Sequence, residues 1–219
     1  MKKTLYSLTL MDDLVRAVDQ LAYENNTSRS NMVNRILADY LSLTTPEMYL
    51  RDLFSRIEDL LNGQSAIQVM ELPSESILTL RTALDYKYRP TLRYALELIH
   101  RDSVWEGQLR IGLRSQNRPL LEHLQEFYRV FVQAERRQKA PLALPEAHYS
   151  LQGHKLVRRF ALPGGMTPQT AGDAITAFLT MLDQAVKAWF DRLEDPAEGR
   201  QQVEAIYRDY LHSHKAAVL

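Results

Sequence analysis

The first forty residues change from a two-residue period to a helical period of apolar positions. Residues 4–10 alternate in character, which predicts a short strand with two unlike faces. One face would carry Tyr6, Leu8 and Leu10, and the other Leu5, Ser7 and Thr9. Asp12 or Asp13 can then cap a helix that ends at the asparagine pair 25–26, and Ser28 can cap a second helix. The apolar positions are Leu14, Val18, Leu21 and Ala22 in the first helix, and Val33, Ile36, Leu37 and Tyr40 in the second.

A unit made of one strand and two short helices is too small to bury a core alone. Its single strand would also leave unpaired backbone groups on both edges. Two copies that pair strand to strand and interlock their helices would remove both deficits, which predicts a homodimer or a higher even oligomer. The SLTLMDD strand exit, the AYENNTSRS turn and the apolar spacing of both helices resemble the ribbon-helix-helix superfamily, the Arc and MetJ type of DNA-binding protein. The resemblance covers about a fifth of the chain.

The resemblance implies that two strands enter the major groove of double-stranded DNA as a ribbon. The base-contacting residues would be Leu5, Ser7 and Thr9. The phosphate-contacting residues would be Lys2 and Lys3 of the N-terminal arm, with the backbone amides of Ser28 and Arg29 at the start of the second helix. Hydroxyls offer one hydrogen bond each and leucine can touch a thymine methyl group, but none of these makes a bidentate pair with a base. The chain departs here from the family's usual arginine or asparagine. An alternative is that the unit only dimerises the rest of the chain.

A connecting helix follows this unit. Thr45 and Pro46 resemble a cap and a first helical position, and Asn62-Gly63 is typical of a helix end. Its apolar positions are Leu50, Leu53, Phe54, Ile57, Leu60 and Leu61. We therefore expect a ribbon-helix-helix module at residues 1–43, a connecting helix at 44–63, and a further domain at 64–219 for oligomerisation, effector binding or partner binding.

The remaining residues alternate between strand and helix periods. The predicted strands span about residues 76–88, 92–98, 108–115 and 155–162, although residues 92–99 also fit a helix. Their inward positions include Leu78, Leu80, Leu84, Tyr86, Tyr88, Leu92, Tyr94, Leu96, Leu98, Leu109, Ile111 and Leu113. Three predicted helices start near Asn117, Thr167 and Asp195. The helix that starts near Asn117 ends with the cations Arg136, Arg137 and Lys139, where the helix dipole favours positive charge. This order predicts an α+β fold with a mostly antiparallel sheet, covered by helices on its apolar face.

Composition narrows the function classes. The absence of cysteine among 219 residues excludes disulfides, thiolate metal sites and a cysteine nucleophile. The formal net charge is zero, so DNA binding would depend on where charges lie and not on their total. We find no apolar run long enough to span a membrane and no signal peptide, which predicts a soluble, cytoplasmic protein without a membrane partner.

A basic face is predicted on the sheet between residues 76 and 118. The residues opposite the leucines include Arg81, Lys87, Arg89, Arg93, Arg110 and Arg114. Four of them, Arg81, Arg93, Arg110 and Arg114, could hold a small anionic effector or an acidic protein partner. The alternative is a solvated strand face, on which long cationic side chains keep the sheet soluble.

No enzyme or metal site stands out. Among six histidines only His212 and His214 are close in sequence, and a spacing of two points them to different helix faces. The turn Pro163-Gly164-Gly165 lacks the lysine and the glycine spacing of a phosphate loop. We expect no catalytic residues, no metal and no cofactor.

These patterns predict a homodimeric, sequence-specific DNA-binding protein that acts as a transcriptional repressor. A two-fold dimer implies a palindromic or repeated half-site. A plasmid or mobile-element accessory factor, in partition or relaxosome assembly, is the alternative, with the larger domain docking a protein partner. An antitoxin is a third interpretation, although antitoxins usually carry a short disordered tail.

Overall fold

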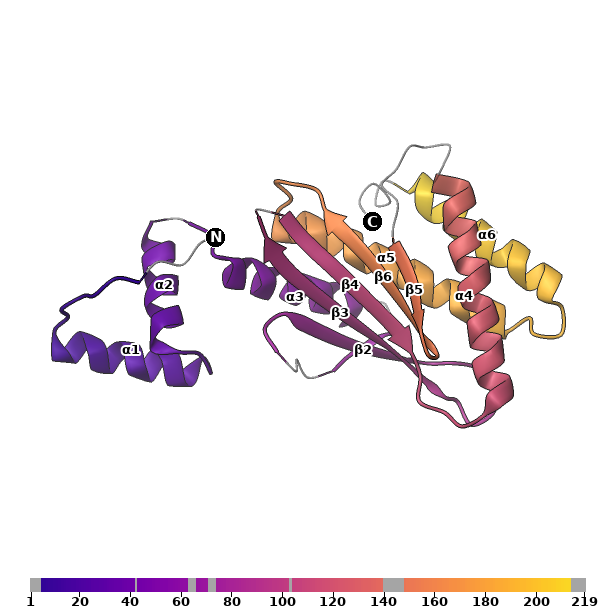
Figure 1. Ribbon diagram of the computed structural model, residues 1–219, viewed down its shortest axis with the longest axis horizontal. Helices are drawn as coiled ribbons and strands as arrows, with labels where there is room; N and C mark the ends of the chain where they lie inside the picture. Colours follow the sequence, from indigo (N-terminus) through magenta and orange to yellow (C-terminus); the bar gives the residue numbers. More distant parts are fainter. Residues whose placement is uncertain are drawn as a thin grey trace.

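The chain forms six helices and six strands in the residues that the computed structural model describes, which are 5–41, 43–62, 66–70, 74–102, 104–139 and 148–213 (Figure 1). The helices are α1 (Asp12–Glu24), α2 (Arg29–Tyr40), α3 (Pro46–Asn62), α4 (Arg118–Lys139), α5 (Pro168–Phe190) and α6 (Pro196–His212). The strands are β1 (Gln68–Val69), β2 (Ile77–Ala83), β3 (Thr91–Arg101), β4 (Val104–Gly112), β5 (His148–Gln152) and β6 (Lys155–Leu162).

All six strands belong to one antiparallel sheet. Their order is β1-β2-β3-β4-β6-β5, so each strand pairs antiparallel with its neighbours. The register sets Leu80 opposite Tyr94, Tyr94 opposite Ile111, and Ile111 opposite Leu156, which aligns apolar side chains across four strands. The predicted α+β class and antiparallel sheet are therefore confirmed.

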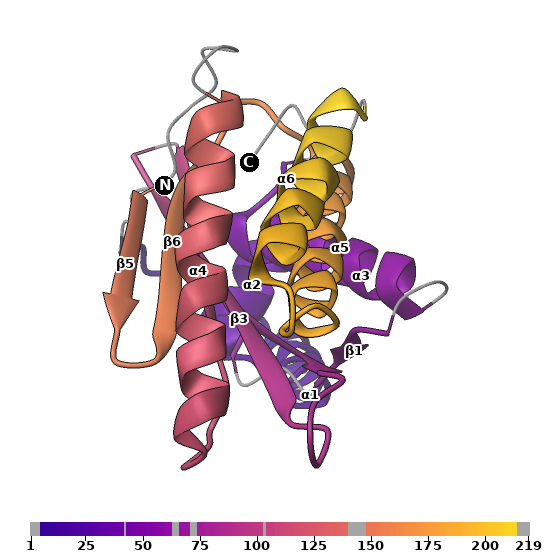
Figure 2. The ribbon, with the colours of Figure 1, turned by 90° about the vertical axis from the view of Figure 1, so that its right-hand side faces the viewer.

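One face of the sheet carries the core. Helices α3 and α5 lie behind it in Figure 1, and α4 and α6 lie on the same side in Figure 2. Within this layer α3 packs beside α5, α5 beside α6, and α6 beside α4. Most of the predicted inward residues are buried: Leu78, Leu80, Leu84, Leu92, Tyr94, Leu96, Leu98, Leu109, Ile111 and Leu113. The prediction is wrong at Tyr88, which is 87% exposed because it lies in the connection after β2. Because residues 91–101 form β3, their interpretation as a strand is right and the helical alternative is wrong.

Strand boundaries differ from the prediction at two turns. β2 ends at Ala83, five residues before the predicted end, because the chain reverses there and the Leu84 amide donates to the Pro90 carbonyl at 3.0 Å. Lys87 and Arg89 consequently lie in the connection between β2 and β3, outside the sheet face to which the alternating pattern assigned them. β4 begins four residues earlier than predicted, at Val104, and includes Gly107. A Cβ atom at Gly107 would lie 2.3 Å from the Phe160 ring, so any larger residue there would have to displace that ring.

Local caps fix most helix starts. Ser28 and Thr167 accept hydrogen bonds from first-turn amides of α2 and α5, as predicted. Asp195, which was predicted only to precede the last helix, caps α6 in the same way. The first helix differs: its N-cap is Met11 and makes no side-chain hydrogen bond, so neither Asp12 nor Asp13 caps it. Both carboxylates lie in the first turn instead, where the helix dipole still favours them.

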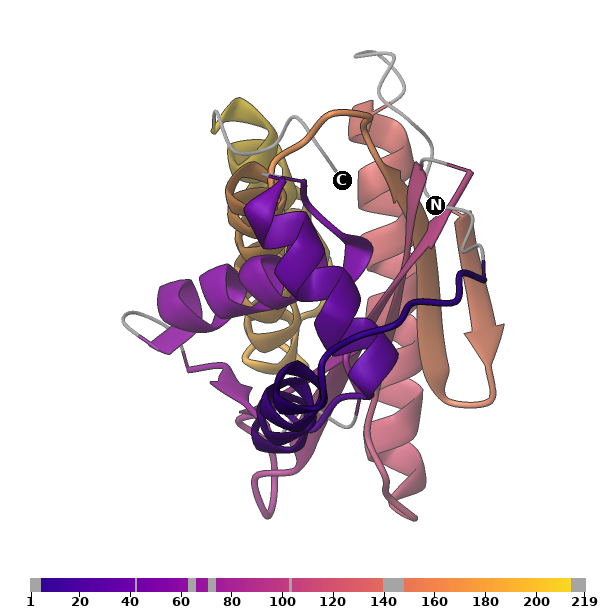
Figure 3. The ribbon, with the colours of Figure 1, turned by 90° about the vertical axis from the view of Figure 1, so that its left-hand side faces the viewer.

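The connecting helix α3 is part of the main core. Leu53, Ile57 and Leu61 are at most 1% exposed within the hydrophobic cluster that the sheet and helices share. Arg56 adds an ion pair to Asp173 at the start of α5, with an N–O distance of 2.9 Å. In contrast, α1 and α2 stand apart from the sheet in Figure 1, and Figure 3 views the molecule from their side.

Candidate functional site

The predicted N-terminal strand does not form in the single chain. Residues 5–11 precede α1 without secondary structure, and the first strand of the described residues begins at Gln68. Neither face of the segment is buried, since Leu5 is 97% exposed and Leu8 is 66% exposed. A lone strand has no partner for its backbone groups within one copy, so the prediction of a strand in the single chain is wrong for a physical reason. The two predicted base-contacting hydroxyls, Ser7 and Thr9, lie on this exposed segment.

Helices α1 and α2 bury only three side chains between them. Their buried residues are Ala22, Met32 and Ala38. The predicted inner faces are wrong for the single chain at Leu14, Leu21, Ile36, Leu37 and Tyr40, all of which are exposed. Among the exposed large apolar side chains of the described residues, all but Tyr88, Ile99, Val104 and Leu151 fall within residues 5–43. The N-terminal unit therefore leaves its apolar surface uncovered in one copy, which is typical of an interaction surface.

The start of α2 combines a cap with a cross-helix ion pair. The Asn31 amide donates to Ser28 Oγ at 3.2 Å, while helix geometry leaves the other amides of the first turn without an intrahelical acceptor. The Arg29 guanidinium donates to the Asp19 carboxylate at 2.5 Å. That hydrogen bond lowers the pKa of Asp19. A phosphate contact at Arg29 would thus involve its backbone amide and not its side-chain charge. Lys2 and Lys3 lie outside the described residues, as do Gly63 and His214.

Three of the four arginines of the predicted basic face lie on the sheet face away from the helices. Arg81 and Arg93 are exposed and directly opposed across β2 and β3, on the face away from the helices. Arg81 donates to the Gln68 side chain at 3.0 Å, and Arg110 pairs with Glu97. Arg114 is exposed beyond the end of β4. None of the four lines the cavity described below. Arg110 lies on the same sheet face as Arg93, opposite Ala95, but its charge is paired with Glu97.

A buried charge cluster, formed by Glu135, Lys139, Tyr149 and Arg158, joins α4 to β5 and β6. Glu135 lies 3.1 Å from Arg158 and 3.0 Å from Lys139, and the Tyr149 hydroxyl donates to it while accepting from Arg158. Burial alone would raise the pKa of Glu135, but the charges of Arg158 and Lys139 outweigh burial and hold that pKa below its ordinary value. Burial lowers the pKa of Lys139.

The sequence contained a signal for this cluster. Arg158 occupies an inward position of β6, between Leu156 and Phe160, where alternation leads one to expect an apolar residue. Lys139 was interpreted as a cation at a helix end, whereas it is 4% exposed and pairs with Glu135 one turn earlier. An inward-facing arginine and an i, i+4 acid–base pair could together have predicted a buried ion pair.

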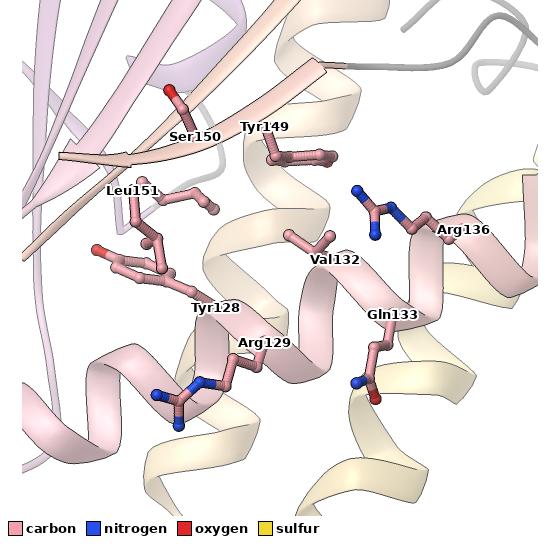
Figure 4. A pocket seen from close by; sticks show the side chains of 9 residues that line it. Tyr128, Arg129, Val132, Gln133, Arg136, Tyr149, Ser150 and Leu151 are labelled. Atoms are coloured by element: carbon pink, nitrogen blue, oxygen red, sulfur yellow. The ribbon is translucent and has the colours of Figure 1, made fainter.

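A cavity of about 340 Å³ opens between α4 and the edge strand β5 (Figure 4). Its lining residues are Tyr128, Arg129, Val132, Gln133, Arg136, Tyr149, Ser150, Leu151 and Leu156. None of these residues was predicted as a ligand contact, and the sequence pattern did not predict strand β5. The cavity exists only once β5 pairs with β6 beside α4.

No protein-family model, curated protein or solved structure matches this chain. No helix in the described part of the chain is long and apolar enough to cross a membrane. The same part holds no group of three or more histidine, aspartate or glutamate side chains placed to bind a metal ion.

Proposed function

We propose that this chain is a homodimeric, sequence-specific DNA-binding protein of the ribbon-helix-helix type that acts as a transcriptional repressor. The observation that carries the proposal is the uncovered apolar surface of residues 5–43 together with the extended, unpaired segment 5–11. A second copy would pair its segment antiparallel to the first and cover the exposed helix faces. Each copy then supplies what the other lacks.

The chemistry of the segment suits contact with base edges. Alternation places Leu5, Ser7 and Thr9 on the face opposite Tyr6, Leu8 and Leu10. With the three larger apolar residues at the dimer contact, Ser7 and Thr9 are free to make single hydrogen bonds in the major groove. Leu5 is placed to contact a thymine methyl group. Readout by single hydrogen bonds predicts moderate discrimination between sequences.

Register on DNA would come from the start of α2. The first-turn amides beside Ser28 are preorganised for a phosphate at the positive end of the helix dipole. Because Asp19 already neutralises the Arg29 side chain, the amides and not this guanidinium supply the attraction. A repressor needs no further chemistry, since occupancy of the site suffices to block it.

Selection of bound sequences from random duplex DNA tests the proposal. We expect one enriched motif with two-fold or direct repetition. Fluorescence anisotropy on that motif should show that Thr9→Ala weakens binding about fivefold, the value of one lost hydrogen bond, with little change on random DNA. Thr91→Ala, at an exposed threonine of β3, is the matched control and should leave both affinities unchanged. If no motif is enriched, the proposal fails.

A further inference from the structure

Most of the wall of the cavity between α4 and β5 is apolar. Tyr149 and Leu151 descend from β5, and Tyr128 and Val132 face them from α4 (Figure 4). The two tyrosine hydroxyls are already engaged: Tyr128 donates to the Ile111 carbonyl at 3.0 Å, and Tyr149 donates to Glu135. Both tyrosines consequently offer ring surface, and not hydrogen-bonding groups, to an occupant. An occupant must be mainly apolar to replace water there favourably.

One end of the cavity carries a cation whose charge is not compensated. In Figure 4 the Arg136 side chain reaches back over Val132 towards the Tyr149 ring. Arg136 makes no hydrogen bond or ion pair with any residue that the structure describes. Arg129, two helical turns earlier, donates to Glu126 at 2.8 Å and points away from β5. The cavity thus combines apolar walls with a single available positive charge at one end.

We propose that this cavity binds a small amphiphilic monocarboxylate, with its apolar body between the tyrosine rings and its carboxylate on Arg136. A guanidinium matches a carboxylate through two parallel hydrogen bonds, which an alcohol or an amine cannot reproduce. The volume of about 340 Å³ lies at the lower end of the range for small-molecule sites, so the ligand is compact. One uncompensated cation favours one carboxylate over two.

This assignment moves the expected anion site away from the sheet face. There, Arg110 is paired with Glu97, and the neighbouring Arg81 and Arg93 stand on an open strand surface with no apolar wall beside them. Arg136 is exposed as well, so charge alone would gain a carboxylate little at either place, and the apolar contact makes the difference. The α4–β5 cavity supplies the apolar contact that the sheet face lacks.

Calorimetric titration of the full chain with sodium octanoate tests the proposal, with sodium 3-phenylpropanoate as an aromatic probe. We expect saturable binding of at least one probe and a matching rise in melting temperature. A higher affinity for octanoate would assign an alkyl body to the ligand, and a higher affinity for 3-phenylpropanoate an aryl body. Acetate lacks the apolar body and 1-octanol lacks the charge, so each should bind at least about tenfold more weakly.

Two arginine variants of the exposed face of α4 decide where the carboxylate binds. Arg136→Gln should weaken binding about tenfold or more, whereas Arg137→Gln should change it less than about twofold. Arg137 is the matched control, because it lies on the same helix, pairs with Glu204 and does not line the cavity. Equal losses in the two variants, equal affinity for octanoate and octanol, or no binding of either carboxylate would overturn the proposal. Since no DNA is present in the measurement, its outcome does not depend on the proposed DNA-binding function.

Discussion

Arg158 donates to Glu135 at 3.1 Å inside the core, where the two side chains are only 1% and 3% exposed. The guanidinium also lies over the Phe178 ring at 4.2 Å, which ties β6 to α5. Neither charge has access to bulk water, so each depends on the other, and Lys139 and Tyr149 add to the balance around Glu135. The cluster makes the packing of α4 against β6 depend on charge balance as well as on apolar contact.

Removal of the Glu135 carboxylate should lower the stability of the fold. Glu135→Leu leaves Arg158 and Lys139 buried without their carboxylate, and we expect it to lower the free energy of unfolding by about 3–5 kcal/mol. Urea denaturation followed by circular dichroism measures the loss. Glu126→Gln is the matched control, because it removes an exposed carboxylate that pairs with Arg129 on the same helix and should cost at most about 1 kcal/mol. Equal effects would contradict the importance of burial.

Acid should weaken the fold through the same carboxylate. The pKa of Glu135 is lowered in the folded state, so its contribution is present above the unfolded pKa, near 4.5, and is lost as pH falls through the folded pKa. We therefore expect the free energy of unfolding to decline below about pH 4.5, with a shallower decline in Glu135→Gln than in the parent chain. Denaturation curves across pH 3–7 provide the comparison, and identical slopes in both chains would be evidence against it.

Two leucines of the N-terminal segment should behave oppositely. Leu8→Asp would put a charge at the proposed two-fold contact, and we expect the dimer dissociation constant to rise by at least about a hundredfold. Leu5→Asp is the matched control on the other face, and it should leave the dimer intact while weakening DNA binding. Sedimentation or light scattering over a concentration series measures the first effect. A Leu8→Asp variant that stays dimeric would locate the dimer contact elsewhere.

The position of α3 predicts where a stable fragment begins. A fragment of residues 44–219 retains Leu53, Ile57 and Leu61 in the core and should melt cooperatively. A fragment of residues 64–219 lacks these buried side chains and uncovers the face of α5 beside them, so it should melt at a much lower temperature or without cooperativity. Thermal melts followed by circular dichroism distinguish the two results. A cooperative melt of the shorter fragment at the same temperature would show that α3 links the two parts of the chain without stabilising the core.

Local sequence patterns predicted much of the larger domain. The caps Ser28 and Thr167 were predictable because each depends only on one side chain and the next three amides. Strand β6 was predicted with its observed bounds, since Leu156, Phe160 and Leu162 recur at even spacing around Arg158 and the turn Pro163-Gly164-Gly165 follows its end. The short edge strands β1 and β5 were missed, because two to five residues of mixed polarity carry too little periodicity.

The candidate sites were less predictable. The residues of the predicted DNA interface that lie in the described part are exposed, and residues 5–11 form no strand in one copy, where no described segment pairs with their backbone groups. The carboxylate site was not foreseen, since its residues come from α4, β5 and β6, which meet only through the strand order β4-β6-β5.

By itself the sequence determined the element types, most of their caps and the apolar face of the sheet, because propensity and periodicity act between residues a few positions apart. Tertiary structure alone decided that α3 belongs to the core, that Arg158 and Glu135 meet inside it, and that a cavity remains beside Arg136. Those outcomes depend on pairing between segments distant in the chain. Such pairing is selected by the total burial and charge balance of the whole packed domain, and no local window of residues contains that information.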